Sequence, residues 1–171
     1  MTGPAASPAG ATALHCPSAQ PDMAEAEVLG VASGSPEAPR LAYLNARLPV
    51  SEDLLAMTAP LPPTRVLRFA ARCTERQCTH FDGAKCQLAV RIVEMLPEVS
   101  EELPPCVIRR TCRWYAQEGR AACLRCPQIV TYTGEPDERI SLVAMGRRPL
   151  GDAPPFAGEP SAMPIDGAAA G

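Results

Sequence analysis

Seven cysteines between positions 73 and 126 are the residues of this 171-residue chain best suited to chemistry. Their spacing reads C-x4-C-x-H-x5-C, then nineteen residues, then C-x5-C-x10-C-x2-C. In a reducing compartment, thiols clustered in this way predict a bound metal rather than structural disulfides. Reduced structural cysteines and a redox-active disulfide are the alternatives. The seven candidates are Cys73, Cys78, Cys86, Cys106, Cys112, Cys123 and Cys126.

The spacing favours an iron–sulfur cluster over zinc. Structural zinc sites commonly use two short C-x2–4-C pairs around one ion. Here Cys123–Cys126 is such a pair, and Cys73–Cys78 is a looser candidate. A cubane spreads its iron corners over more space than a single ion, so its ligands can come from unevenly spaced segments. We therefore expect one or two iron–sulfur clusters of the [4Fe–4S] type, with zinc as the alternative cofactor.

The number of ligands suggests two sites. A complete set of four consists of Cys106, Cys112, Cys123 and Cys126. The other three cysteines lack a fourth ligand, which His80 could supply, although a surface or helix-capping role is the alternative for this histidine. A vacant fourth position would instead leave one iron open to substrate. The sequence also allows ligands of the two sets to mix.

The cysteine region is the basic part of an acidic chain. Residues 65–132 hold eleven Lys or Arg against seven Asp or Glu, and the remainder holds five against twelve. Arg109, Arg110, Arg113 and Arg125 lie one to three residues from candidate ligands. Arginines stabilise the negative charge of a thiolate-ligated centre and can raise its reduction potential. A solvated basic face is the alternative, and a nucleic-acid surface is a third option that we do not favour.

The remaining signals are weaker. Trp114 and Tyr115 could exclude water from a cluster, but we expect them in the core, as the largest apolar groups available. Cys123–Cys126 could also be a thioredoxin-like redox pair, which the absence of a βαβ pattern disfavours. No phosphate-binding loop, nucleophile elbow or HExxH motif occurs, so any catalysis would come from the metal centre. Whether the chain is an enzyme is open, and we lean against it.

Four segments are expected to position these residues. Residues 1–39, rich in Pro, Ala, Gly and Ser, predict a disordered head that leaves Cys16 as a free thiol outside the metal site. Residues 40–64 predict short helices and a proline linker, with Leu41, Leu44 and Leu48 at helical spacing. Residues 65–134 are the cysteine-rich metal-binding domain, and residues 135–171 predict a mostly disordered tail.

The elements expected inside this framework are few. Ser51 predicts the cap of a short helix, Lys85–Pro97 is the strongest helix, and Val107–Gly119 is a second helix that Gly119 ends. Short β-branched runs at residues 65–70 and 127–134 could form a strand pair. The predicted fold is therefore a small, mostly α, metal-organised cysteine-rich domain with irregular loops, possible pairing of two short strands, and disordered tails at both ends.

The expected function follows from the metal centre. Residues 1–25 have neither a basic start nor an apolar stretch, so we expect no signal peptide, no membrane segment and a cytoplasmic location. We expect a small iron–sulfur protein that transfers electrons or senses redox state for a partner protein. The alternative is a zinc-stapled structural module that mediates protein or nucleic-acid binding.

Overall fold

A four-stranded antiparallel sheet forms the centre of the computed structural model, which describes residues 13–35, 38–129, 131 and 138–146. Its strands are β1 (His15–Ala19), β2 (Glu27–Ser35), β3 (Ala38–Pro49) and β4 (Leu67–Arg72), in the spatial order β1-β4-β2-β3. The prediction of a mostly α domain was therefore wrong. Long-range strand pairing supplies this architecture, and of the four strands the sequence indicated only β4, which overlaps the strand expected at residues 65–70.

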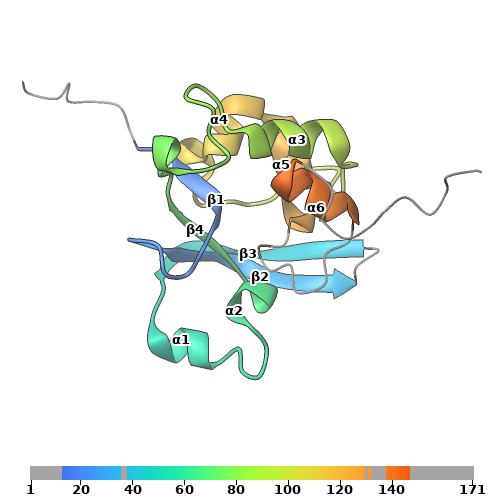
Figure 1. Ribbon diagram of the computed structural model, residues 1–171. Coiled ribbons are helices and arrows are strands. Elements are labelled where there is room, and N and C mark those ends of the chain that lie inside the picture. Colours follow the sequence, from blue (N-terminus) through green and yellow to red (C-terminus); the bar gives the residue numbers. More distant parts are fainter. Residues whose placement is uncertain (1–12, 36–37, 130, 132–137, 147–171) are drawn as a thin grey trace, which may run out of the picture.

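Helices cover both faces of the sheet (Figure 1). Four lie above one face: α3 (Gln87–Met95), α4 (Arg113–Glu118), α5 (Arg120–Arg125) and α6 (Glu138–Met145). Two short ones, α1 (Glu52–Ala56) and α2 (Pro63–Val66), lie below the other face. Three single 3₁₀ turns complete the described elements: η1 (Glu75–Gln77), η2 (Arg109–Thr111) and η3 (Cys126–Gln128).

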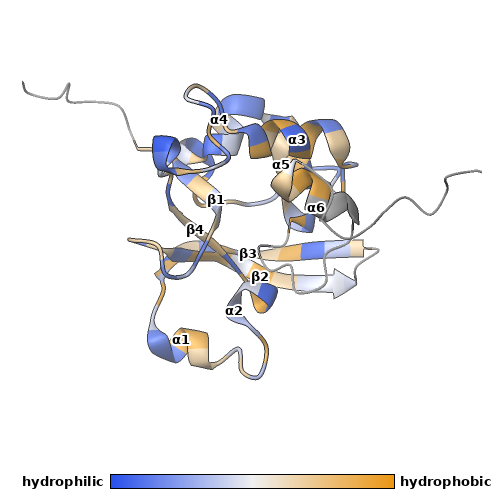
Figure 2. Ribbon diagram, in the orientation of Figure 1, coloured by the Kyte–Doolittle hydropathy of each residue, from blue (hydrophilic) through white to orange (hydrophobic). Residues whose placement is uncertain are grey.

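Strand β4 divides the interior into two cores, because successive side chains of a strand point to opposite faces. Leu67, Phe69 and Ala71 pack below the sheet, whereas Ala70 belongs to the core above it. The upper core is built from apolar residues of the helices, and Figure 2 shows apolar positions along α3 and α5 in this layer. Arg68 lies two residues before Ala70, on the same face of β4, so its charged side chain points toward the helices.

The first two strands lie in the segment expected to be a disordered head. Edge strand β1 pairs only with β4, and β2 lies between β4 and β3. Low β-propensity of Pro, Ala and Gly concealed both strands. Leu41, Leu44 and Leu48 are in β3, not in a helix, because their three- and four-residue spacing coincides with a strand whose pairing register shifts at a bulge.

Several local predictions agree with the structure. Helix α3 forms within Lys85–Pro97, and the hydroxyl of Ser51 accepts a hydrogen bond from the amide of Leu54 at the start of α1. The second predicted helix is shorter: η2 precedes α4, which ends at Gly119, where φ is +61° and only glycine is unstrained.

Two predictions fall partly outside the described residues. Of the expected strand at 127–134, Pro127 and Gln128 lie in η3, and positions 130 and 132–134 are not described. Most of the predicted tail is not described either, although its residues 138–145 form α6. No helix among the described residues is both long and apolar enough to cross a membrane.

Candidate metal centres

The cysteines sort into two groups that line separate cavities. The first cavity, which we call centre I, is lined by the complete set predicted from the sequence: Cys106, Cys112, Cys123 and Cys126. The second cavity, centre II, is lined by Cys16, Cys73, Cys78 and Cys86. All eight thiols are free in the structure. The two sets predicted from the sequence therefore line different cavities, and Cys16, which was assigned to the disordered head, lies with the set of three.

Secondary structure presents these sulfurs at the starts of helices and turns. Cys86 is the N-cap of α3, Cys112 is the N-cap of α4, and Cys126 begins η3. Cys123 lies within α5, one turn before Cys126. Helix N-termini leave backbone amides without intrahelical partners, and these amides favour a negatively charged sulfur.

A shared backbone arrangement recurs at five of the cysteines. The amide two residues further along the chain lies against the sulfur, and a hydrogen bond in this position favours a thiolate. The amide of His80 donates to the Cys78 sulfur at 3.4 Å. The same relation holds for Cys16 and Ser18, Cys86 and Leu88, Cys106 and Ile108, and Cys112 and Trp114.

At Cys16, Cys86, Cys106 and Cys112, burial outweighs these amides and keeps the thiols neutral. Burial raises the pKa of Cys16 and of Cys112 to about 12. Burial also raises the pKa of Cys86, Cys106 and Cys123. Because it is the thiolate that binds metal, a metal bound at these cysteines would have to displace the thiol protons.

Arg68 is a buried cation between the two centres. Its side chain is only 3% exposed, and it donates to the carbonyls of Pro17 and Ile129. One guanidinium nitrogen lies 4.0 Å from the sulfur of Cys126, and the guanidinium lies 5.6 Å from the ring centroid of Trp114. None of the ion pairs found among the described residues includes Arg68. A buried charge is costly without a partner of opposite charge. The sulfur of Cys126 is the neighbouring group that could supply a negative charge, as a thiolate.

Further donors without acceptors gather at both cavities. At centre I the hydroxyl of Tyr43, Nε of Arg109 and Nε1 of Trp114 are buried and have no oxygen or nitrogen acceptor among the described residues. The groups nearest to Tyr43 and Arg109 are the sulfurs of Cys126 and Cys123. At centre II the same is true of Nε of Arg113 and the hydroxyl of Thr131. Such atoms normally find partners in a folded protein. Each of the five can donate, so both cavities suit a group rich in acceptors.

Of the four arginines noted in the sequence, two line the cavities and two do not. Arg109 lines centre I and Arg113 lines centre II, where its guanidinium also lies 5.3 Å from the ring centroid of Phe81. Arg110 is exposed. Arg125 faces away from the cysteines and bonds the carbonyls of Leu96 and Ala121.

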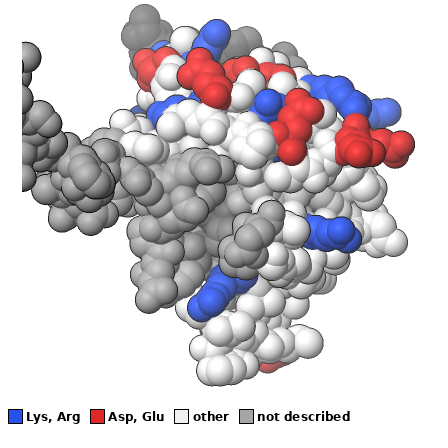
Figure 3. Space-filling model, turned by 90° about the vertical axis from the view of Figure 1, so that its right-hand side faces the viewer, with Lys and Arg blue, Asp and Glu red and all other residues white. Residues whose placement is uncertain are grey.

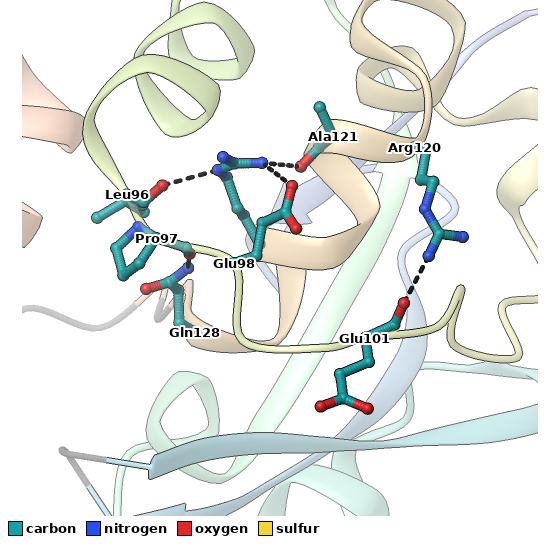
Figure 4. Close-up of polar contacts among 8 residues, drawn as sticks. Leu96, Pro97, Glu98, Glu101, Arg120, Ala121 and Gln128 are labelled. Atoms are coloured by element: carbon teal, nitrogen blue, oxygen red, sulfur yellow. Dashed lines mark hydrogen bonds and ion pairs between the residues drawn. The ribbon is translucent and has the colours of Figure 1, made fainter.

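Arg125 belongs to a network that fixes the loop leading to Cys106. Figure 4 shows Gln128 donating to the carbonyl of Pro97 at 2.7 Å and Arg120 donating to the carbonyl of Glu101. These contacts tie the loop after α3 to α5 and η3. Cys106 at the end of this loop is thereby held close to the two cysteines of α5 and η3.

His80 lines centre II, but its imidazole is engaged elsewhere. A guanidinium nitrogen of Arg91 lies 3.3 Å from Nδ1 of His80. Arginine can only donate, so Nδ1 accepts and the proton of the neutral ring is assigned to Nε2. Burial and the adjacent Arg91 lower the pKa of His80 and keep the ring neutral.

Trp114 is among the largest fully buried side chains and packs in the upper core, as expected, while its ring also lines centre I. Tyr115 packs against the same core. Cys123 and Cys126 share their cavity with two more cysteines, so the structure does not isolate them as a redox pair.

The cavities differ in size. Centre I encloses about 20 Å³, close to the space that one water molecule occupies. Centre II encloses about 230 Å³. Within the described ranges, no group of three or more His, Cys, Asp or Glu side chains is arranged to hold a metal ion as it stands. Binding would therefore require the side chains to adjust around the bound group.

Charge on the surface is mixed. Figure 3 shows acidic and basic side chains interspersed over the upper part of one face, above a largely uncharged region. On this face the arginines thus do not form the uniform basic patch that a nucleic-acid surface requires.

Comparison with known proteins gives no match: no protein-family model fits the sequence, and no curated protein or solved structure is significantly similar to it.

Sequence reasoning missed two residues of the site. Cys16 lies in a Pro- and Ala-rich stretch that carries no strand signal. Arg68 is far along the chain from Cys126, although the alternation of β4 indicates that Arg68 faces opposite to Leu67 and Phe69.

Proposed function

We propose that the chain is an iron–sulfur protein that binds a [4Fe–4S] cluster at centre I and exchanges electrons with a partner protein. The observation that carries this proposal is the lining of one cavity by four cysteines together with buried donors that have no acceptor. The cysteines are suited to ligate the four irons of a cubane. The buried donors are suited to form hydrogen bonds with the sulfides and thiolates of the cluster.

The surroundings match the charge of such a cluster. Four thiolates give a cluster net negative charge, and buried Arg68 beside Cys126 has no carboxylate partner among the described residues. Burial and the neighbouring Cys126 raise the pKa of Tyr43, so its hydroxyl keeps its proton and can donate. Hydrogen bonds to cluster sulfurs stabilise the reduced state more than the oxidised state.

Electron transfer is the activity that this ligation supports best. Four cysteine ligands occupy one corner each and leave no iron free for substrate. Trp114, 2% exposed, limits the access of water to the cavity. The centre is thus suited to gain and lose an electron without binding a substrate, which serves a carrier or a redox sensor equally.

A structural zinc site is the second candidate. Its support is the short Cys123–Cys126 pair and the volume of about 20 Å³ at centre I, which suits one ion better than a cubane. In this alternative the folded domain mediates binding, and the thiolate charge is held by the same arginines.

The test is elemental and spectroscopic analysis of the full chain purified without oxygen. Cluster binding predicts a brown protein with about four irons and four sulfides for each cubane. Cys123→Ala should abolish the centre I signal and destabilise the domain, because metal binding and folding are coupled in a small core. Arg110→Ala, an exposed change in the adjacent turn, is the matched control. A colourless folded protein with tightly held zinc would overturn the proposal.

A further inference from the structure

We propose that centre II is a second iron–sulfur site in which Cys16 supplies the fourth thiolate beside Cys73, Cys78 and Cys86. This inference rests on the proposed iron–sulfur chemistry and extends it to a cavity for which only three cysteine ligands were evident from the sequence. Its basis is the convergence of four cysteines from three separate segments on one cavity.

Sheet pairing brings the first two ligands together. In the antiparallel register of β1 and β4, Cys16 lies opposite Ala71, and Cys73 follows the end of β4. The amide of Cys73 donates to the carbonyl of Leu14 at 2.8 Å, which continues the ladder past the strand. Two residues far apart in the sequence are thus neighbours through backbone hydrogen bonds alone.

A compact loop presents the other two ligands. Phe81 and Cys86 form an isolated antiparallel bridge, and the carboxylate of Asp82 accepts from the amides of Ala84 and Lys85 at 2.9 and 2.7 Å. This turn places Cys78 and Cys86 on the same side. Gln117 then fixes Cys86, since its side chain accepts from the amide of Cys86 at 2.8 Å and donates to its carbonyl at 3.1 Å.

Cys16 has the same local environment as the other candidate ligands. The amide of Ser18 lies against its sulfur, as the amide of His80 lies against Cys78. The Arg113 and Thr131 side chains supply buried donors without acceptors to this cavity. Centre II also has room: about 230 Å³ is several times the volume that a single ion requires.

Cys16 fits the fourth position better than His80. Ligation by His80 through Nδ1 would break its contact with Arg91, and ligation through Nε2 would require the ring proton to move to the nitrogen that Arg91 occupies. Cys16 requires neither change. With Cys16 in place, every iron of a cubane has a thiolate, and centre II carries electrons without an open corner for substrate.

The two centres are close enough to exchange electrons. His15, next to Cys16, forms a parallel bridge with Cys112 of centre I. Consecutive Cα atoms are about 3.8 Å apart and paired strands about 4.8 Å apart, so the backbones of Cys16 and Cys112 approach within about 9 Å. Each centre would take one electron from a redox partner protein and return one, with no bond made or broken. Assembly of a [4Fe–4S]2+ core takes up two ferrous ions, two ferric ions and four sulfides, and it releases one proton from each of the four thiols.

The test compares iron binding by variants of the full chain, reconstituted without oxygen with ferrous iron, ferric iron and sulfide. The wild type should bind about eight irons, four in each cubane. Cys16→Ser should lose about half of the iron, or retain a cluster with an altered electron paramagnetic resonance spectrum, while the centre I signal persists. Ser33→Ala, an exposed change in β2 at a residue that lines neither cavity, is the control. His80→Ala should keep all the iron.

The outcomes separate the two proposals. Loss of iron in His80→Ala but not in Cys16→Ser would overturn the assignment of Cys16. A wild type with one cluster, lost in Cys123→Ala and unaffected by Cys16→Ser, would overturn centre II and leave the proposed function standing. A wild type that binds no iron would overturn both. If Cys16→Ser fails to fold, thiol alkylation decides: in the wild type, iron and sulfide should protect Cys16 to the same extent as Cys73, and an unchanged rate at Cys16 would refute ligation.

Discussion

Arg68 and Cys126 lie 4.0 Å apart, nitrogen to sulfur, at the boundary between the helices and the sheet. The same guanidinium donates to the carbonyl of Pro17, the residue after Cys16. One buried cation is therefore placed next to a ligand candidate of each centre. This position gives it an electrostatic influence on both.

Arg68→Met is expected to lower the reduction potential of the loaded protein. A hydrogen bond to a charged group contributes roughly 1.5–3 kcal/mol, and each tenfold change in a one-electron equilibrium corresponds to about 59 mV, so the decrease should be about 60–130 mV. Redox titration followed by visible absorption measures it. Arg72→Met, an exposed change in the same strand, is the control and should shift the potential far less. Equal shifts for the two variants would contradict a specific role for Arg68.

Tyr43→Phe is expected to have opposite effects on the metal-free and loaded forms. In the metal-free protein the buried hydroxyl has no oxygen or nitrogen partner among the described residues and faces the weakly accepting thiol of Cys126. Its removal should therefore raise the free energy of unfolding by about 1 kcal/mol. In the loaded protein the hydroxyl donates to the cluster, and its removal should speed the release of iron to a chelator. Denaturant melts measure the unfolding free energy of the metal-free form, and chelation kinetics measure the release of iron from the loaded form. Faster unfolding of both forms would show that the hydroxyl has another partner.

Gln117→Leu is expected to weaken centre II and spare centre I. The substitution removes two hydrogen bonds to the backbone of Cys86, at roughly 1 kcal/mol each. Iron of centre II should therefore leave up to thirtyfold faster, about 2 kcal/mol expressed as a rate. Glu118→Ala is the control, since it removes only the contact between Glu118 and the Gln117 amide. Uniform loss from both centres would point to general unfolding instead.

Arg125→Ala is expected to loosen the loop that ends at Cys106. The side chain holds the carbonyls of Leu96 and Ala121 at 2.7 and 2.9 Å, so its loss should cost about 2 kcal/mol and preferentially release iron from centre I. Hydrogen exchange of residues 96–106 would locate the change. Glu98→Gln removes only the exposed ion pair with Arg125, worth at most about 1 kcal/mol, and should leave centre I intact.

The sequence allowed the prediction of elements specified by nearby residues. Helix α3 has an apolar face and a proline after its last turn, and Ser51 caps α1 through its own hydroxyl. The four cysteines that the sequence grouped as one set line one cavity, and they lie within one short region of the chain. Strands β1 and β2 were missed, since small residues such as Ala and Gly gain their strand conformation from partners far along the chain.

The same physical limit applies to the site. Cys16 becomes a ligand candidate only through the pairing of β1 with β4, and the sequence around it contains no metal-binding spacing. Arg68 contacts Cys126 only because β4 directs it toward the helices. Both positions depend on tertiary structure, so spacing along the chain could not identify them.

The pairing of β1 with β4 also determines when centre II can mature. As the chain leaves the ribosome, Cys16 appears early, but its partner strand follows only after β2, β3 and both lower helices. Cys86, the last ligand of this set along the chain, emerges later still. Closing so long a loop through a metal restricts the unfolded chain, an effect of about 4 kcal/mol for a cross-link over this length. If centre II binds a cluster as proposed, the earliest ligand to be synthesised waits for the latest, and iron and sulfide are delivered to centre II after translation of most of the domain.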